Sequence, residues 1–181
     1  MKDRSKKGSY DRDIKPLVDL LNATSTYKTT SSCSGRIVLL EIPKIGDKQH
    51  AQWHYVVHTL ADPKVIFGIL QQHRKPLWFL QEPAILHVQC KTLAAARTLL
   101  TLAQCAGFKR SGIISLQKNF LELRGTEHIE TLLTQDLSEE YVITLVALAN
   151  EKLQRTKDKI TALLQAVVNC GDTLQEDLSG S

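Results

Sequence analysis

The sequence predicts a single α+β domain with a mixed or antiparallel sheet, helices packed against it and a long C-terminal helix. Segments of strand character occur mostly as adjacent pairs between helical segments, an order typical of α+β proteins. The chain has 181 residues, 43% of them hydrophobic, which is enough for a compact core without disulfides or structural metals. Its nine glycines form no GxGxxG or P-loop pattern, so we do not expect a doubly wound Rossmann fold.

Hydrophobic periodicity and capping residues predict four helices. Asp62 followed by Pro63 predicts the start of the second helix, and Thr92 and Gly107 predict the two ends of the third. The fourth helix would be roughly 45 Å long at about 1.5 Å per residue, so we expect it either to wrap the sheet or to break near Asn150. The predicted helices span residues 14–22, 62–73, 92–107 and 138–168.

Runs of aliphatic, β-branched and aromatic residues predict the strands. Glu82 and Pro83 separate two such runs, which predicts two strands with a break between them. The small polar segment 29–35 (TTSSCSG) predicts a tight turn or a ligand loop, and residues 43–48 (PKIGDK) predict a hairpin connection. The predicted strands span residues 36–42, 52–60, 76–81, 84–90, 111–117 and 119–124.

The net charge of +4 is concentrated near the N-terminus, where the first fifteen residues carry six basic and three acidic side chains. This surplus suits either a polyanionic partner or a solvated surface. We predict one catalytic domain over residues 1–170, which includes a mobile basic arm at 1–10, and a disordered tail at 171–181. No apolar run is long enough for a membrane span and no signal-peptide core is present, so we expect a cytoplasmic protein.

The four cysteines are widely spaced and form no CxxC pair, so we expect reduced thiols and no zinc site. Cys33 lies three residues before Arg36, which leaves a thiol mechanism, a tight turn and a ligand loop as interpretations. Cysteine phosphatases place the arginine six residues after the cysteine, so this spacing argues against covalent catalysis by Cys33. A ligand loop would use backbone amides and hydroxyls as hydrogen-bond donors, and Gly35 would let the backbone approach a ligand closely.

The histidines at positions 50, 54 and 58 are four residues apart in a segment that predicts a strand. Neighbouring members would then be about 13 Å apart, too far for one metal ion, so no metal is expected. Trp53 could stack on a nucleobase or belong to the core. His87 lies in an apolar run and could be a core histidine or face a pocket.

Six segments spread along the chain together resemble one known family. They are DRSKKGSYD (3–11), SSCSGRI (31–37), WHYVVH (53–58), EPAILHVQC (82–90), GFKRSGI (107–113) and EEYVITLVALANEKL (139–153). In this order they resemble the tRNA wybutosine-synthesizing protein 3 family, over about residues 3–165. Thr59 follows His58 where the family usually has aspartate, so any pairing of those two side chains is lost.

The resemblance implies an α+β fold of the family's own type and an S-adenosylmethionine-dependent methyltransferase. Its substrate would be guanosine 37 of tRNA-Phe, in the anticodon loop, after conversion to 7-aminocarboxypropyl-demethylwyosine, and the methyl group would go to ring nitrogen 4. A non-catalytic RNA-binding protein with a basic arm and an aromatic strand face is the alternative. A thiol-dependent hydrolase is a second alternative, and it would require Cys33.

The expected roles follow from what methyl transfer requires: a held donor, an aligned acceptor and a group that takes a proton. The expected proton acceptors are Asp11, His58 and His87. The expected cofactor-binding residues are Ser31, Ser32, Cys33, Ser34, Gly35 and Arg36. The expected tRNA-binding residues are Ser5, Lys7, Gly8, Trp53, Glu82 and Ser111.

Overall fold

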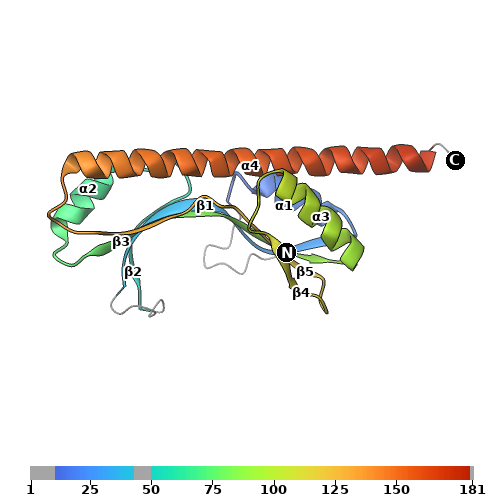
Figure 1. The fold of residues 1–181 in the computed structure, drawn as a ribbon, viewed down its shortest axis with the longest axis horizontal. Coiled ribbons are helices and arrows are strands. Elements are labelled where there is room, and N and C mark those ends of the chain that lie inside the picture. Colours follow the sequence, from blue (N-terminus) through green and yellow to red (C-terminus); the bar gives the residue numbers. More distant parts are fainter. Residues whose placement is uncertain (1–10, 43–49, 180–181) are drawn as a thin grey trace. The chain divides into compact units, whose positions relative to one another are not determined.

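The computed structural model describes residues 11–42 and 50–179, with side chains up to residue 170. Four helices and six strands alternate along this part of the chain (Figure 1). They are α1 (Lys15–Ala23), β1 (Tyr27–Glu41), β2 (Gln52–Val57), α2 (Pro63–Gln72), β3 (Leu77–Cys90), α3 (Leu93–Cys105), β4 (Gly112–Ser115), β5 (Phe120–Arg124), β6 (Ile129–Leu133) and α4 (Glu139–Ser179).

The strands form one sheet in the order β2-β1-β3-β5-β4, with β6 also paired to β3. The pairs β1–β2, β3–β5, β3–β6 and β4–β5 are antiparallel. The predicted α+β class with an antiparallel sheet is therefore confirmed, and the doubly wound fold is excluded because that fold needs a parallel sheet.

Strands β1 and β3 are longer than the sequence predicts. Segment 29–35 was expected to be a turn or loop and is instead the polar half of β1. Glu82 and Pro83 lie inside β3 rather than between two strands. Pro83 is tolerated because Leu77–Gln81 pair with β6 and Ile85–Gln89 pair with β5, so the proline falls between the two paired segments and its missing N–H breaks no bond of these ladders.

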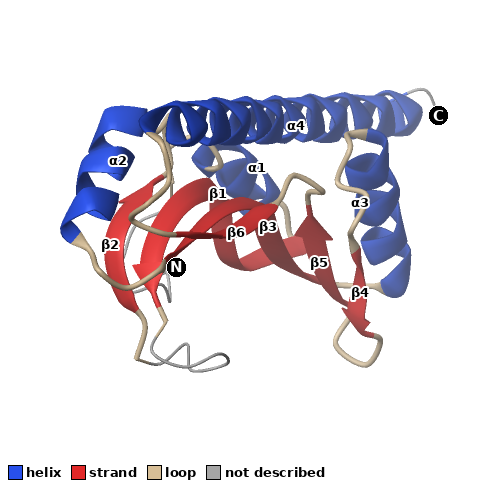
Figure 2. Cartoon of the chain, turned by 60° about the vertical axis from the view of Figure 1, so that its left-hand side comes forward, coloured by secondary structure: helices blue, strands red, loops and turns tan. Residues whose placement is uncertain are grey.

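The chain divides into two compact units. The first contains the described residues up to 34, residues 84–126 and the chain from 157 onward. In this unit α1, α3 and the later part of α4 bury one face of the sheet, as Figure 2 shows for α1 and α3. The core is made of aliphatic side chains together with Phe108, with Leu86, Val88 and Cys90 contributed by β3. Burial raises the pKa of the Cys90 thiol to about 11, so this cysteine is a neutral core residue.

The second unit contains residues 35–83 and 127–156. Its core joins β1, β3 and β6 to α2 and to the first part of α4, with Phe79 among its fully buried side chains. The loop before α2 is tied to α4 by Asn150. The Asn150 amide accepts a hydrogen bond from Ala61 N at 2.8 Å and donates one to Ala61 O at 2.9 Å.

Replacing Asn150 by alanine is expected to lower the free energy of unfolding by about 1–3 kcal/mol, because both polar backbone groups of the buried Ala61 lose their partner. Urea unfolding monitored by circular dichroism measures this loss. The Thr144→Ala control, at an exposed position of the same helix, should stay within about 0.5 kcal/mol of the parent. Equal stability of Asn150→Ala and Thr144→Ala would show that the two hydrogen bonds between Asn150 and Ala61 do not contribute to the free energy of unfolding.

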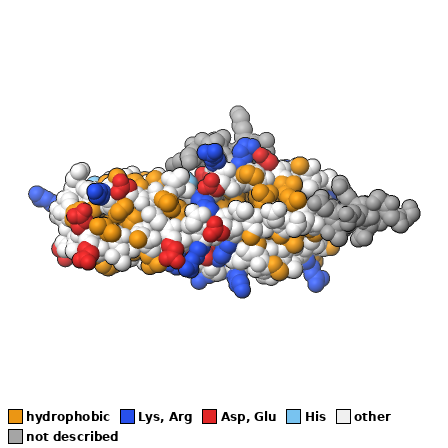
Figure 3. Space-filling view, turned by 90° about the horizontal axis from the view of Figure 1, so that it is seen from above, with side chains coloured by type: hydrophobic (Ala, Val, Ile, Leu, Met, Phe, Trp, Pro, Cys, Tyr) orange, Lys and Arg blue, Asp and Glu red, His pale blue; other side chains and the backbone are white. Residues whose placement is uncertain are grey.

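Helix α4 does not break near Asn150, although the sequence left that possibility open. It also continues to Ser179, inside the segment 171–181 for which a disordered tail was predicted. The predicted basic arm at 1–10 and the connection at 43–48 lie outside the described residues. In Figure 3 apolar side chains lie scattered among acidic and basic ones. Two large hydrophobic residues of α4, Tyr141 and Leu148, are exposed. Among the described helices, none combines the length and apolar character that a membrane crossing needs.

Candidate active site

His87 is held at both ring nitrogens in the first unit. Its Nδ1 lies 2.7 Å from Ser31 Oγ on β1, and its Nε2 lies 2.9 Å from Glu122 Oε2 on β5. Residues 86, 88 and 90 of β3 face the core, so the alternation of the strand places His87 on the opposite face. His87 and Glu122 are direct cross-strand partners, which explains why the two side chains meet.

The protonation of this set follows from its partners. A carboxylate can only accept a hydrogen bond, so His87 Nε2 carries the proton that points to Glu122. Nδ1 of the neutral ring is then an acceptor, and Ser31 donates its hydroxyl proton to it. The ring also stacks on Phe120, at a centroid distance of 5.8 Å and an interplanar angle of 15°, which fixes its orientation further. His87 and Glu122 retain 23% and 26% exposure of their side chains, so the set is accessible.

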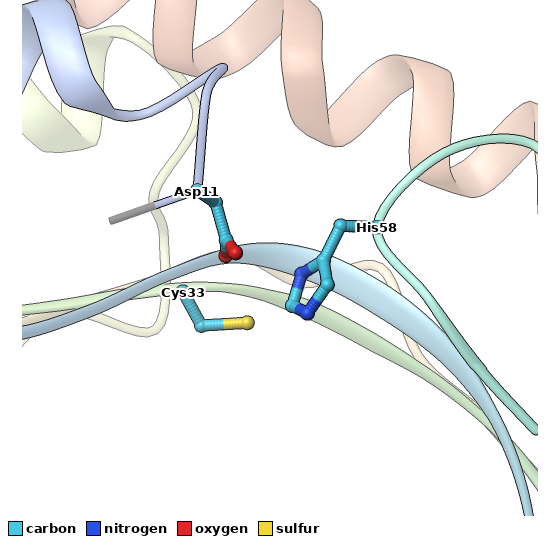
Figure 4. Close-up of side chains that lie close together, drawn as sticks. All are labelled: Asp11, Cys33 and His58. Atoms are coloured by element: carbon cyan, nitrogen blue, oxygen red, sulfur yellow. The ribbon is translucent and has the colours of Figure 1, made fainter. Parts of the chain in front are cut away.

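Asp11 and Ser34 meet in the same unit. Asp11 Oδ2 accepts a hydrogen bond of 2.9 Å from the Ser34 backbone amide, and Figure 4 shows this carboxylate beside the side chain of Cys33. Lys157 of α4 donates to Ser34 Oγ at 2.9 Å and forms an ion pair of 2.6 Å with Asp13. The buried hydroxyl of Ser34 therefore bonds to Lys157, a residue that no motif of the sequence singles out.

The predicted donors of the segment 31–34 are not equivalent. Ser31 is bonded to His87 and Ser34 to Lys157, whereas Ser32 Oγ is buried and has no hydrogen-bond partner among the described residues. A buried hydroxyl without a partner costs about 1–3 kcal/mol, a cost that a bound polar ligand removes. Ser32 is thus the member of this segment that fits a ligand-binding role. Cys33 is partly exposed and forms no disulfide with a described residue.

Gly35 and His58 belong to the second unit. Gly35 has φ of +88°, in the left-handed region, so the polar half of β1 ends at an irregular residue. His58, which follows β2 and is drawn in Figure 4, places its Nδ1 at 3.1 Å from the carbonyl oxygen of Gly35. The carbonyl oxygen can only accept a hydrogen bond, so Nδ1 carries the proton in this contact.

Arg36, Glu82 and Trp53 come together in the second unit. Arg36 Nε pairs with Glu82 Oε2, and the Arg36 guanidinium carbon lies 5.1 Å from the centre of the Trp53 ring. Trp53 is 51% exposed, so it does not belong to the core. A guanidinium on one side of the indole leaves the other side for an aromatic ligand such as a base.

The histidine series 50, 54 and 58 does not form one set. His54 contacts the ring of His73 with centroids 4.2 Å apart, and burial, followed by the charge of His73, lowers the pKa of His54. The nearby carboxylate of Glu41 opposes this shift but is itself bonded to Lys75, which lowers the pKa of Glu41. His54 therefore belongs with His73 and Glu41, and we assign it a structural role.

The remaining predicted residues fall outside these groups. Ser111 Oγ donates to Phe108 O at 2.6 Å and accepts from Arg124 N at 3.0 Å, a bridge that fixes the start of β4. Ser5, Lys7 and Gly8 lie outside the described residues. Glu122 and Lys157 are the polar contributors that sequence reasoning missed. Alternation in 119–124 predicts that Glu122 points away from the core, but its partner depends on the register with β3.

The fold is an antiparallel α+β fold, so the protein is not a doubly wound enzyme. The Ser–His–Glu set on the open face of its sheet is suited to proton transfer. A family model described as Methyltransferase TYW3 matches residues 1–169. The chain belongs to this family and is a methyltransferase, and it therefore requires a methyl donor. The resemblance stated from sequence is confirmed, and the non-catalytic alternative is not favoured.

Relatives from two domains of life support this assignment. The chain is 41% identical over 165 residues to tRNA(Phe) 7-((3-amino-3-carboxypropyl)-4-demethylwyosine(37)-N(4))-methyltransferase 1 of Pyrococcus furiosus, covering 87% of this chain and 84% of the relative. It is 39% identical over 168 residues to the tRNA wybutosine-synthesizing protein 3 homolog of Xenopus laevis, covering 88% and 67%. Among solved structures, the PH1069 protein of Pyrococcus horikoshii superposes with a TM-score of 0.82 at 38% identity, covering 90% of this chain and 87% of that one.

Proposed function

We propose that the protein transfers the methyl group of S-adenosylmethionine to ring nitrogen 4 of 7-aminocarboxypropyl-demethylwyosine at position 37 of tRNA-Phe, in the cytoplasm. The observation that carries the chemical part of the proposal is the hydrogen-bonded set of Ser31, His87 and Glu122. Methylation of a nitrogen that bears a proton needs a group that takes this proton, and His87 is positioned to do so.

The N4 lone pair attacks the methyl carbon, the bond from that carbon to the sulfonium sulfur breaks, and S-adenosylhomocysteine leaves with both electrons of that bond. The N4 proton passes to Ser31 Oγ while the Ser31 hydroxyl proton passes to His87 Nδ1. Glu122 stabilises the imidazolium that results and keeps the ring in the tautomer that accepts at Nδ1.

S-adenosylmethionine supplies the electrophilic methyl group when it is bound. Ser32 fits a polar group of this donor because its buried hydroxyl has no partner among the described residues. In this proposal Ser31 acts as a proton relay, and Ser34 positions the strand through Asp11 and Lys157. Gly35 lets the backbone approach the methyl donor closely, and Cys33 has no covalent role.

Trp53 and Arg36 are proposed as contacts of the anticodon loop. The exposed indole offers a stacking surface worth about 1–3 kcal/mol per base, and the Glu82 carboxylate holds the guanidinium against it. His58 and Asp11 remain candidates for proton transfer, but both already bind backbone atoms of β1. We therefore favour His87.

The proposed reaction is tested with labelled S-adenosylmethionine and tRNA-Phe that carries the demethyl precursor. We expect label in the modified base with the wild-type protein and with Cys33→Ser, which retains most of the activity. Label that requires an intact Cys33 would instead support a thiol mechanism. The absence of label in the base, with a demonstrably folded protein and bound tRNA, would refute the reaction.

A further inference from the structure

A polar cavity lies in the first unit, where the start of β1, the end of β3 and the turn between β4 and β5 meet. It has a volume of about 400 Å³ and is lined by residues 25–28 at the start of β1, 89–91 at the end of β3 and 117–119 in the turn between β4 and β5. This volume is within the range of small-ligand sites. We call it the lysine pocket, because each of the three segments contributes one lysine: Lys28, Lys91 and Lys118.

The lysine pocket is strongly electropositive. Its lining contains three lysines and no aspartate or glutamate. All three lysines are exposed, and none of them forms an ion pair with a described residue. Other surface cations of the chain, such as Lys15, Lys75 and Arg155, are paired with a carboxylate. The unpaired charges of the pocket therefore favour an anionic ligand.

The walls of the pocket are fixed by the backbone. The Lys91 amide donates to Thr26 O at 2.9 Å, and the Cys90 amide donates to Asn119 O at 3.0 Å. Asn119 adopts φ of 48°, a left-handed conformation that asparagine tolerates, and its side-chain amide donates to Lys91 O at 3.4 Å. The three lysine backbones are therefore held together before any ligand binds, which lowers the entropy cost of binding.

The lining offers charge but no free aromatic surface. Tyr27 is partly buried, and its hydroxyl donates to Ala95 O at 3.3 Å, so the ring is committed to the protein. Amide and hydroxyl side chains supply the other polar groups. Lysines bind phosphate as flexible point charges, without the fixed geometry of an arginine fork. These features fit a sugar-phosphate backbone better than a nucleobase.

The pocket lies close to the His87 set along the same strand. Lys91 is four positions after His87, directly beyond the end of β3 at Cys90, which corresponds to about 13 Å of extended chain. We infer that the lysine pocket binds backbone phosphates of the tRNA substrate, next to the nucleotide whose base lies at His87. This inference rests on the proposed function, because it takes RNA to be the ligand, but it assigns a site that is separate from the methyl-transfer groups.

The test measures binding of tRNA-Phe carrying the demethyl precursor by fluorescence anisotropy at several salt concentrations, without S-adenosylmethionine. Each lost phosphate contact reduces the slope of log K against log salt by about 0.7–0.9, so Lys28→Gln/Lys91→Gln/Lys118→Gln should lower it by about 2. The same relation predicts a loss of affinity on the order of 100-fold at about 0.1 M salt. Circular dichroism confirms the fold of the variant.

A charge-matched control separates the pocket from general electrostatics. Lys64→Gln/Arg74→Gln/Arg97→Gln removes three exposed cations outside the pocket and should change the affinity less than about threefold. Equal losses in the two triple variants would overturn the inference. If the wild-type protein binds and methylates tRNA while the pocket variant binds like the control, only the pocket assignment fails. If the wild-type protein does not bind tRNA, the proposed function fails as well.

Discussion

Gly35→Ala is expected to be the most destabilising of the conservative substitutions considered for this protein. The backbone at this position has φ of +88°, and a Cβ would lie 3.1 Å from the backbone oxygen of Glu82. It would also approach the Thr156 and Leu153 side chains to 3.0 and 3.2 Å. The strained conformation costs about 1–2 kcal/mol, and the crowding adds about 1–3 kcal/mol. We expect a total loss of about 2–5 kcal/mol.

Gly68→Ala is the matched control for this prediction. Gly68 lies within α2, and a Cβ added there meets no atom within 4 Å. Alanine in a helix interior is favoured over glycine by about 0.5–1 kcal/mol, so this variant should be more stable than the parent. Urea unfolding of both variants therefore gives shifts of opposite sign. A Gly35→Ala protein that unfolds with the parent would contradict both the left-handed conformation and the tight packing.

The position of Gly35 shows what the sequence could predict at this site and what it could not. The glycine was expected because a Cβ would obstruct a turn or a close approach to a ligand, whereas the structure requires it for the left-handed backbone and the close contact with Glu82 O. The turn predicted around it is wrong, because β1 continues through the polar segment. Strand prediction relies on apolar alternation, which 29–35 lacks. Several of its polar groups bond to partners outside the segment, as when Asn22 exchanges two hydrogen bonds with Thr29.

Local signals were reliable where capping decides the structure. Asp62 accepts a hydrogen bond from Lys64 N at 2.9 Å, and Thr92 accepts one from Ala95 N at 3.1 Å, so α2 and α3 begin where the sequence predicts. Strand β6 (Ile129–Leu133) was missed because five residues with weak alternation carry little signal, and its pairing with β3 supplies the missing stabilisation.

The functional contacts depend on long-range register, which no local pattern specifies. His87 was expected to face either the core or a pocket. The alternation of β3 places it on the open face of the sheet. Glu122 lies 35 residues away and reaches His87 only because β3 and β5 pair in this register. A shift of one residue would turn Glu122 into the core. The pairing register is therefore what assembles the proposed proton acceptor.

His87→Ala is expected to reduce kcat for methyl transfer by about 10²–10⁴-fold, the usual contribution of a general base. Glu122→Gln should reduce kcat by about 10- to 100-fold, because the amide neither stabilises the imidazolium nor fixes the tautomer that accepts at Nδ1. The KM for tRNA should change little in both variants, since neither side chain is proposed to bind the RNA backbone. Single-turnover methylation with the precursor tRNA measures these rates.

Three further variants distinguish a positioning role of Glu122 from a structural one. Glu130→Gln removes the carboxylate of another histidine contact, the exposed His128–Glu130 pair at 3.4 Å, and should leave kcat unchanged. Glu122→Asp should recover part of the rate. The double variant His87→Ala/Glu122→Gln should be no slower than His87→Ala, because Glu122 acts only through the ring. Additive losses in the double variant would place Glu122 outside the relay, and a wild-type rate in His87→Ala would transfer the role of proton acceptor to Asp11 or His58.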